Sequence, residues 1–190
     1  WIYDPRSGHW PDRIDTPFKC GYGGAAVTTP KGVMLLDYGQ VWLLSVKDRK
    51  WSKVGKPAKL PNGEYDTMIY DSKRKRSILW GGHWTKWNDM WALDLAKPAW
   101  TCLQTNDPKG AEVTARKRPP GMLCPYLNYD PGNDLYWLAA QWSYSPGSGT
   151  WTRHDRKLRG LKKLPYMPWL RPALACDSDG KRFLWWKGGI

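Results

Sequence analysis

Two carboxylates and one guanidinium are the side chains whose types best suit acid–base or charge-pairing chemistry in this sequence. Glu64 and Asp66 stand just before an apolar run, and Arg171 stands just before a similar run near residue 172. If the chain brings these runs together, the three groups meet at one opening, where carboxylates could act in general acid–base catalysis. The alternative is that they hydrogen-bond strand ends and hydrate a rim. An enzyme built around Glu64 and Asp66 is therefore one hypothesis, and a structural role is the other.

Aromatic and basic residues stand in the same place before two further apolar runs. Lys19 and Tyr22 lie in "FKCGYGG", and Tyr126 lies in "MLCPYL". We expect these residues to converge with Glu64, Asp66 and Arg171, so the predicted binding set at this opening is Tyr22, Glu64, Asp66, Tyr126 and Arg171.

The histidines and cysteines show no pattern that binds a metal or forms a covalent intermediate. The 3 histidines are scattered, and the 4 cysteines have no C-x-x-C spacing, so no zinc site is predicted. Motifs of the G-x-S-x-G, P-loop and H-E-x-x-H types are also missing. We therefore expect no metal and no cofactor. The cysteines would allow two disulfides or free thiols, which leaves the compartment open.

A tryptophan-rich stretch, "GGHWTKWND", is the best single candidate for recognition. Trp84 and Trp87 flank Lys86 in it. Exposed indole rings beside a cation can stack on sugars or bases. They can equally anchor a protein partner, because tryptophan is enriched at interface hot spots.

The charge balance points toward acidic partners. The 190 residues include 30 Lys and Arg against 17 Asp and Glu, a net charge of +13, which suits RNA, an anionic glycan or an acidic protein surface. Lysine-rich turns on a soluble protein are the plain alternative. Long basic connections at 103–122 and 152–168 could become ordered on such a partner, and no run is apolar and long enough to span a membrane. The second connection contains the predicted binding residues Arg153, Arg156, Lys157 and Arg159.

The elements that would position these residues follow from a tryptophan pattern. Two tryptophans stand nine residues apart, with apolar residues at alternate positions after the first and a turn before the second. Alternation of this kind is typical of a strand with one buried face. The pattern occurs four times, at Trp1/Trp10, Trp42/Trp51, Trp91/Trp100 and Trp142/Trp151.

Two more strand-like runs precede each of the three later copies of this pattern, with turns in PKG, SKRKR and PGND. A fourth pair of runs, with its turn in SDG, stands at the end of the sequence. All four are turn-forming sequences. Four strands per unit, repeated every 41, 49 and 51 residues between Trp10, Trp51, Trp100 and Trp151, predict a β-propeller. The expected single all-β domain, 1–190, has blades at 19–55, 64–104 and 123–154 and a fourth at 172–190 completed by 1–12.

The fourth blade is expected to close the ring. Written end to end, LWWKGGI and WIYDPRSGHW align without a gap on LYWLAAQWSYSPGSGTW. The N-terminal residues thus supply two outer strands to a unit that has only two inner ones, and closure removes an open sheet edge. Trp1 should then fill a core, with Trp1→Ala costing about 3–5 kcal/mol. A fragment of a longer propeller, or a larger ring shared by two chains, remains the alternative.

The second unit, YDTMIYDSKRKRSILWGGHWTKWNDMWALDLAKPAWTCL, resembles a kelch repeat. The resemblance rests on "MIYD", on Gly81-Gly82 after the second strand, on "NDMWALDL" and on the closing Trp100. The other three units match in part, with Gly188-Gly189 in the fourth and Ala139-Ala140 in the third. The resemblance implies a kelch-like propeller, a family that often has six or seven blades, whereas four are expected here.

The expected function is a non-catalytic recognition or assembly module. It would bind protein partners through loop tryptophans and basic connections. The first alternative is a binder of RNA or an anionic glycan, and the second is the enzyme at Glu64 and Asp66.

Overall fold

The computed structural model describes residues 1–19, 24–57, 60, 67–81, 87–122, 126–139 and 141–154, and the backbone of 173–176 and 183–186. In these ranges the regular secondary structure is all β-strand apart from one short helix, α1 (Ala111–Thr114). The all-β class predicted from the sequence is confirmed.

Three antiparallel sheets of four strands form the body of the molecule. The first sheet contains β3 (Ala25–Thr29), β4 (Gly32–Asp37), β5 (Gln40–Ser45) and β6 (Lys50–Val54). The second sheet contains β7 (Thr67–Asp71), β8 (Arg76–Trp80), β9 (Met90–Asp94) and β10 (Trp100–Gln104). The third sheet contains β11 (Leu127–Asp130), β12 (Leu135–Leu138), β13 (Trp142–Ser145) and β14 (Thr150–Arg153).

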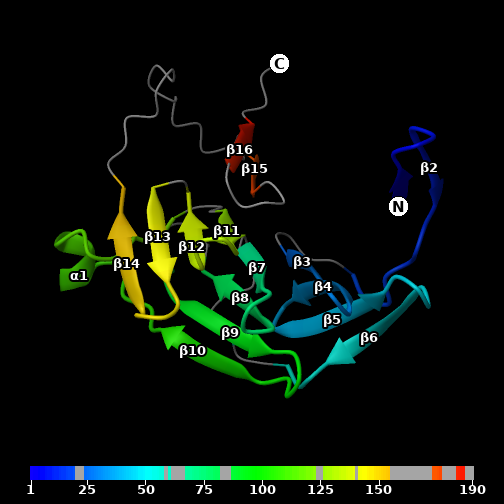
Figure 1. The fold of residues 1–190 in the computed structure, drawn as a ribbon. Coiled ribbons are helices and arrows are strands. Elements are labelled where there is room, and N and C mark those ends of the chain that lie inside the picture. The colour runs from blue at the N-terminus through cyan, green and yellow to red at the C-terminus, as the bar shows by residue number, and fades with distance from the viewer. Residues whose placement is uncertain are drawn as a thin grey trace.

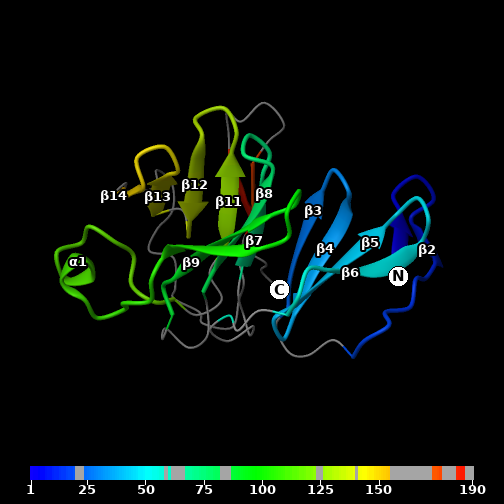
Figure 2. The same ribbon diagram turned by 90° about the horizontal axis from the view of Figure 1, so that it is seen from below.

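Two hairpins flank these sheets, each forming a two-stranded sheet of its own. The N-terminal hairpin is β1 (Ile2–Asp4) with β2 (His9–Asp12), and the C-terminal hairpin is β15 (Ala173–Cys176) with β16 (Phe183–Trp186). The N-terminal hairpin lies beyond β6, on the side away from the second and third sheets (Figures 1 and 2). The pairing of the two hairpins that the sequence predicts is thus not seen in the single chain.

The first strands of the units lie next to one another. β3 contacts β7, β7 contacts β11, and β11 contacts β15, while the last strand of each complete sheet lies outermost (Figure 1). This radial order of sheets around their inner strands is propeller-like.

Two apolar cores fill the spaces between sheets. The core between the first and second sheets includes Met34, Val41, Leu79 and Leu93. The core between the second and third sheets includes Ile78, Trp80, Met90, Tyr136 and Trp142. Successive side chains of a strand point to opposite faces of its sheet, so one sheet can present apolar residues to a neighbour on each side. The sheets therefore pack one after another.

A buried side chain at the end of each inner strand fixes the first turn of its sheet. Asp71 Oδ1 accepts a hydrogen bond from the Arg74 amide at 3.0 Å, and Asp130 Oδ1 accepts one from the Asn133 amide at 3.1 Å. In the first sheet Thr29 Oγ1 accepts from the Lys31 amide at 3.2 Å. Side-chain acceptors of this type satisfy turn amides that would otherwise be buried without a partner.

Candidate interaction surface on the N-terminal hairpin

The N-terminal hairpin has the turn and the ring pair of β13–β14, whereas its register shifts between Ile2 and Asp4 and that of β13–β14 is regular. Its turn closes with the Gly8 amide donating to the Asp4 carbonyl at 2.9 Å, and the Gly149 amide donates to the Ser145 carbonyl at 2.8 Å. Both glycines have a positive φ, 72° and 70°, which the turn requires and which glycine adopts without strain. The ring centroids of Tyr3 and Trp10 are 5.1 Å apart, matching the 5.1 Å between Tyr144 and Trp151.

The two hairpins differ in what covers them. Trp142 and Tyr144 are only 4% and 6% exposed, because Tyr144 stacks on Tyr136 of β12 with centroids 5.7 Å apart and packs into the core against the second sheet. Trp151 completes this contact by donating from Nε1 to Gln104 Oε1 of the second sheet at 2.6 Å.

We call Trp1, Tyr3 and Trp10, the equivalents of those three residues, the aromatic stripe. They are 75%, 49% and 59% exposed. The burial of Trp1 in a closing blade, expected from the sequence, is therefore not found in the single chain. Uncovered aromatic area of this size is characteristic of an interaction surface.

The N-terminal hairpin is tied to the first sheet. Arg49, in the turn before β6, donates from both terminal nitrogens to the Asp12 carboxylate and also to the Arg13 carbonyl at 3.3 Å. These bonds from Arg49 lower the pKa of Asp12 below its ordinary value. Further along the connection, Phe18 stacks on Trp42 with centroids 4.6 Å apart. These contacts hold the hairpin beside β5 and β6.

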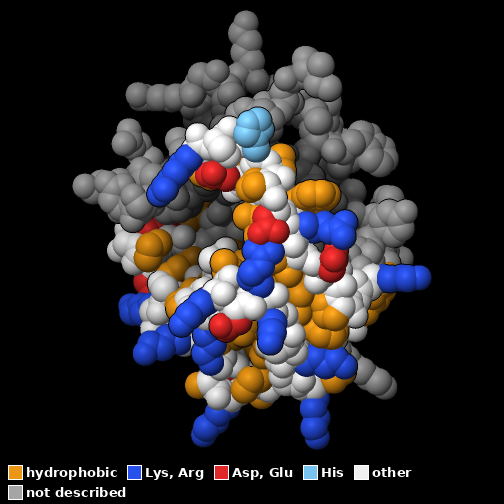
Figure 3. Space-filling view, turned by 90° about the vertical axis from the view of Figure 1, so that its right-hand side faces the viewer, with side chains coloured by type: hydrophobic (Ala, Val, Ile, Leu, Met, Phe, Trp, Pro, Cys, Tyr) orange, Lys and Arg blue, Asp and Glu red, His pale blue; other side chains and the backbone are white. Residues whose placement is uncertain are grey.

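One cation lies over the aromatic stripe and another lies over a tryptophan of the first sheet. The Arg13 guanidinium lies 5.7 Å from the centre of a Trp1 ring, and the Lys53 amine lies 5.4 Å from a Trp42 ring, both within cation–π range. Figure 3 faces this side of the molecule and shows Lys and Arg side chains gathered over it, interleaved with hydrophobic groups. The turn of the N-terminal hairpin and the segment around β6 also carry exposed cations, Arg6, Lys47, Lys50 and Lys56.

All the large hydrophobic side chains that stand exposed in the described part of the chain come from its first 46 residues. They are Trp1, Ile2, Tyr3, Trp10, Tyr38 and Val46. The apolar residues of the second and third sheets are covered by their neighbours, so this side differs from the rest of the surface.

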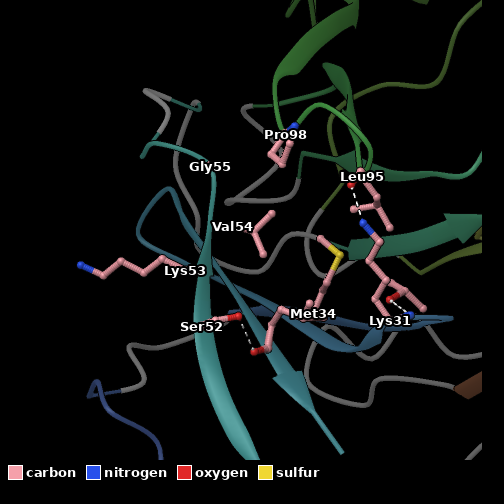
Figure 4. A pocket seen from close by; sticks show the side chains of 10 residues that line it. Lys31, Met34, Ser52, Lys53, Val54, Gly55, Leu95 and Pro98 are labelled. Atoms are coloured by element: carbon pink, nitrogen blue, oxygen red, sulfur yellow. Dashed lines mark hydrogen bonds between the residues drawn. The ribbon is translucent and has the colours of Figure 1, made fainter.

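A pocket of about 240 Å³ opens where the first sheet meets the turn between β9 and β10. Met34, Leu43, Val54 and Leu95 form apolar walls, and Lys31 Nζ donates to the Leu95 carbonyl at 2.8 Å at its edge. Figure 4 shows the Lys53 side chain pointing away from this space. The pocket can hold a small apolar group beside one ammonium, and sequence analysis missed it because its walls come from separate units.

An ion-pair network joins the second and third sheets. Arg74 donates to both Asp134 oxygens at 2.7 Å and to Asp71 at 3.1 Å, and Lys73 reaches Asp134 at 2.7 Å. Arg74 and then Lys73 hold the pKa of Asp134 well below its ordinary value. Burial beside these carboxylates raises the pKa of Tyr129 to about 12. Two cations of the SKRKR turn, Lys73 and Arg74, therefore bind a carboxylate of the neighbouring sheet.

The connection between β10 and α1 is held by a buried clamp that sequence reasoning did not predict. Asn88 donates to the carbonyls of Asp107 and Pro119 and accepts from the Asp107 amide at 2.8 Å. Arg118 donates to Asn88 Oδ1 at 2.9 Å and to the Thr105 carbonyl. Arg118 is buried, and burial lowers its pKa, so this cation stabilises the connection from inside. The interpretation of 103–122 as a basic arm is wrong for Arg118.

Three of the predicted binding residues lie in the described part of the chain. Trp87 is half-buried and packs beside Gly81, where an added Cβ would lie 2.8 Å from the Trp87 Cβ. The Tyr126 carbonyl accepts from the Ala139 amide at 3.0 Å, a strand-end role, and Arg153 is exposed on β14 opposite Trp142. The other predicted residues lie outside the described ranges: Tyr22, Glu64, Asp66, Trp84, Lys86, Arg156, Lys157, Arg159 and Arg171.

Three further observations concern the described residues only. The described residues contain no group of three His, Cys, Asp or Glu side chains placed to hold a metal ion. Cys102 is a free, exposed thiol. No helix within these ranges has the length and apolar character to cross a membrane.

Comparison with known proteins supports the architecture. No family model and no curated protein matches this sequence. A solved structure titled "Structure of YjhT" is similar, with a TM-score of 0.56, 12% identity, and coverage of 76% of this chain and 52% of that chain. The chain thus spans about half the length of that structure. At this identity the likeness concerns the fold alone.

Proposed function

We propose that this protein is a non-catalytic, kelch-like propeller module that recognises, or assembles with, a protein surface. The observation that carries the proposal is the aromatic stripe, whose three rings face solvent, while the equivalent Trp142 and Tyr144 are buried and the equivalent Trp151 is half-buried. Large aromatic side chains beside arginine are the residues most enriched in protein-binding hot spots.

The kelch-like character is supported by the turn chemistry of the inner strands. Asp71, which ends the "MIYD" run, and Asp130 both occupy buried positions where they accept hydrogen bonds from a turn amide. The same role recurring at the same place in two units favours one repeat type over unrelated sheets.

The hairpins at the two ends of the chain are, in this proposal, the outer and inner halves of one blade. The N-terminal hairpin has the turn and the ring pair of β13–β14, and the C-terminal hairpin contacts β11 as an inner pair would. Joining them would complete a fourth unit and cover the edge of β1, whose backbone groups are otherwise open to pairing.

Affinity purification with matched variants tests the proposed function. We expect the wild-type protein and a Tyr38→Ser control to retain the same protein partner. A Trp1→Ser/Tyr3→Ser/Trp10→Ser variant should lose it at both low and high salt. Tyr38 is 67% exposed but lies outside the stripe, so it controls for the loss of an exposed aromatic ring. Equal retention by all three proteins would overturn the proposal.

A second candidate function is the binding of an acidic polymer, RNA or an anionic glycan. It is favoured by the exposed cations Arg6, Lys47, Lys50 and Lys56, in the turn of the N-terminal hairpin and around β6, and by the Lys and Arg side chains gathered on the face seen in Figure 3. Such binding weakens steeply as salt rises, because it releases counterions. Retention of polymer at low salt and its loss at high salt, unchanged in the stripe variant, would support this function in place of the first.

A further inference from the structure

Residues at the same repeat positions in the second and third sheets show what kind of surface packs against the aromatic stripe. Tyr144 of the third sheet lies in the core against the second sheet, and Leu93 of the second sheet lies in the core against the first. Each stripe therefore faces the sheet that precedes it in the chain. The first sheet follows the N-terminal hairpin in the chain, so it is not a sheet of the kind that these positions face, and the stripe stands exposed.

The missing sheet has a matching open end elsewhere in the chain. The third sheet and the C-terminal hairpin, joined through β11 and β15, form an end that has inner strands and no outer ones. The N-terminal hairpin has outer strands and no inner ones. The two ends are complementary in strand type.

We infer that the partner of the aromatic stripe is a second copy of this chain, bound so that the N-terminal hairpin of each copy completes the C-terminal hairpin of the other. This inference rests on the proposed function and names its partner. Two identical exchanges of this kind give a closed two-fold pair.

Joining between copies agrees with the position of the hairpins in one chain. The N-terminal hairpin is held beside the first sheet by Asp12–Arg49 and by Phe18 on Trp42, and it stands apart from the C-terminal hairpin (Figure 1).

The repeat sets the register of the completed sheet. In the third sheet Tyr136 pairs with Tyr144 and Trp137 with Ser143. The alignment of LWW on LYW then places Trp185 of one copy opposite Tyr3 of the other, and Trp186 opposite Ile2. Facing residues in an antiparallel pair have Cα atoms close enough for a disulfide.

Salt separates this association from the binding of a polymer. Each copy carries a net charge of +13, so two copies repel and salt screens the repulsion. An aromatic contact is retained at high salt. Self-association should therefore strengthen with salt, whereas binding to an acidic polymer weakens.

Cysteine trapping tests the inference. In chains whose four native cysteines, among them the exposed Cys102, are replaced by serine, a variant carrying Ile2→Cys is mixed with a variant carrying Trp186→Cys, under mild oxidation and at high salt. We expect a covalent species of twice the 21.9 kDa chain mass that neither variant gives alone. A Tyr38→Cys chain mixed with the Trp186→Cys chain is the matched control, and it should give none.

Three outcomes would overturn the inference. One is a disulfide within a single chain carrying both substitutions and none in the mixture, which means that the ring closes in one copy. Another is no disulfide in either arrangement. The third is a wild-type native mass of one chain at all concentrations and salts. If the stripe variant still loses a different protein partner in the purification above, the proposed function stands while the second-copy inference falls.

Discussion

The N-terminal hairpin and β13–β14 share six of ten residues along WIYDPRSGHW and WSYSPGSGTW and close with the same turn, yet the aromatic rings of one are exposed and those of the other are largely buried. Their glycine turns close with the same bond, and their tyrosine–tryptophan pairs lie at the same 5.1 Å. Tyr144 is 6% exposed and Tyr3 is 49% exposed. The difference lies in the neighbours, since β12 and the second sheet cover one stripe and no described residue covers the other in the same way.

This comparison separates two levels of structure. Local sequence determines the strand pair and its turn, whereas burial is a property of the sheet that packs on it. A hairpin that repeats a buried one without its neighbours therefore marks a place where another sheet fits.

The largest expected effect comes from removing a ring in the covered hairpin. Trp142→Ala should lower the free energy of unfolding by about 3–5 kcal/mol, because it leaves a cavity in the core between the second and third sheets. Urea unfolding of a dilute sample measures this loss. Trp1→Ala, the matched change in the uncovered hairpin, should change the same quantity by less than about 0.5 kcal/mol. Equal losses would mean that Trp1 is already buried in one chain.

The next largest effect concerns the bond between the second and third sheets. Arg74→Ala should cost about 2–3 kcal/mol, since it removes charged hydrogen bonds and leaves Asp71 buried with fewer partners. Lys47→Ala, an exposed turn cation, is the control and should leave the urea midpoint unchanged. A loss as small as that of the control would show that the network does not stabilise the sheet pair.

Acid should weaken the same network. Because the pKa of Asp134 is lowered in the folded state, its stabilising contribution is present above the unfolded value of about 4 and is lost as pH falls through the folded value. The stability difference between wild type and Asp134→Asn, measured by urea unfolding, should therefore shrink as pH falls below about 4. A difference that stays constant with pH would contradict this assignment.

How much the sequence could predict differs between these regions. The alternation after Trp42, Trp91 and Trp142 predicts every complete sheet, because period-two burial is a local property. The buried roles of Asn88 and Arg118 could not be predicted, since they depend on a contact across 30 residues. For the candidate site, the repeat places Trp1 just before the first strand of the hairpin, but the burial that the repeat led us to expect for Trp1 is not found, because burial depends on another sheet.

The smallest effect is expected at the anchor of the uncovered hairpin. Arg49→Ala should leave global stability nearly unchanged, because its bond to Asp12 is exposed and surface ion pairs contribute little. Hydrogen exchange of the β1 and β2 amides should nevertheless become faster, since the hairpin loses its tie to the first sheet. Unchanged exchange there would mean that other contacts hold it.

The most direct test compares amide hydrogen exchange in the two hairpins at low and high protein concentration. In dilute solution, at about 1 μM, β1–β2 should exchange far faster than β13–β14, and at about 100 μM its protection should rise toward that of β13–β14 as a second copy covers the stripe. If β1–β2 is as protected as β13–β14 in dilute solution, or stays unprotected at every concentration, the account of an uncovered stripe that recognises a second sheet is contradicted.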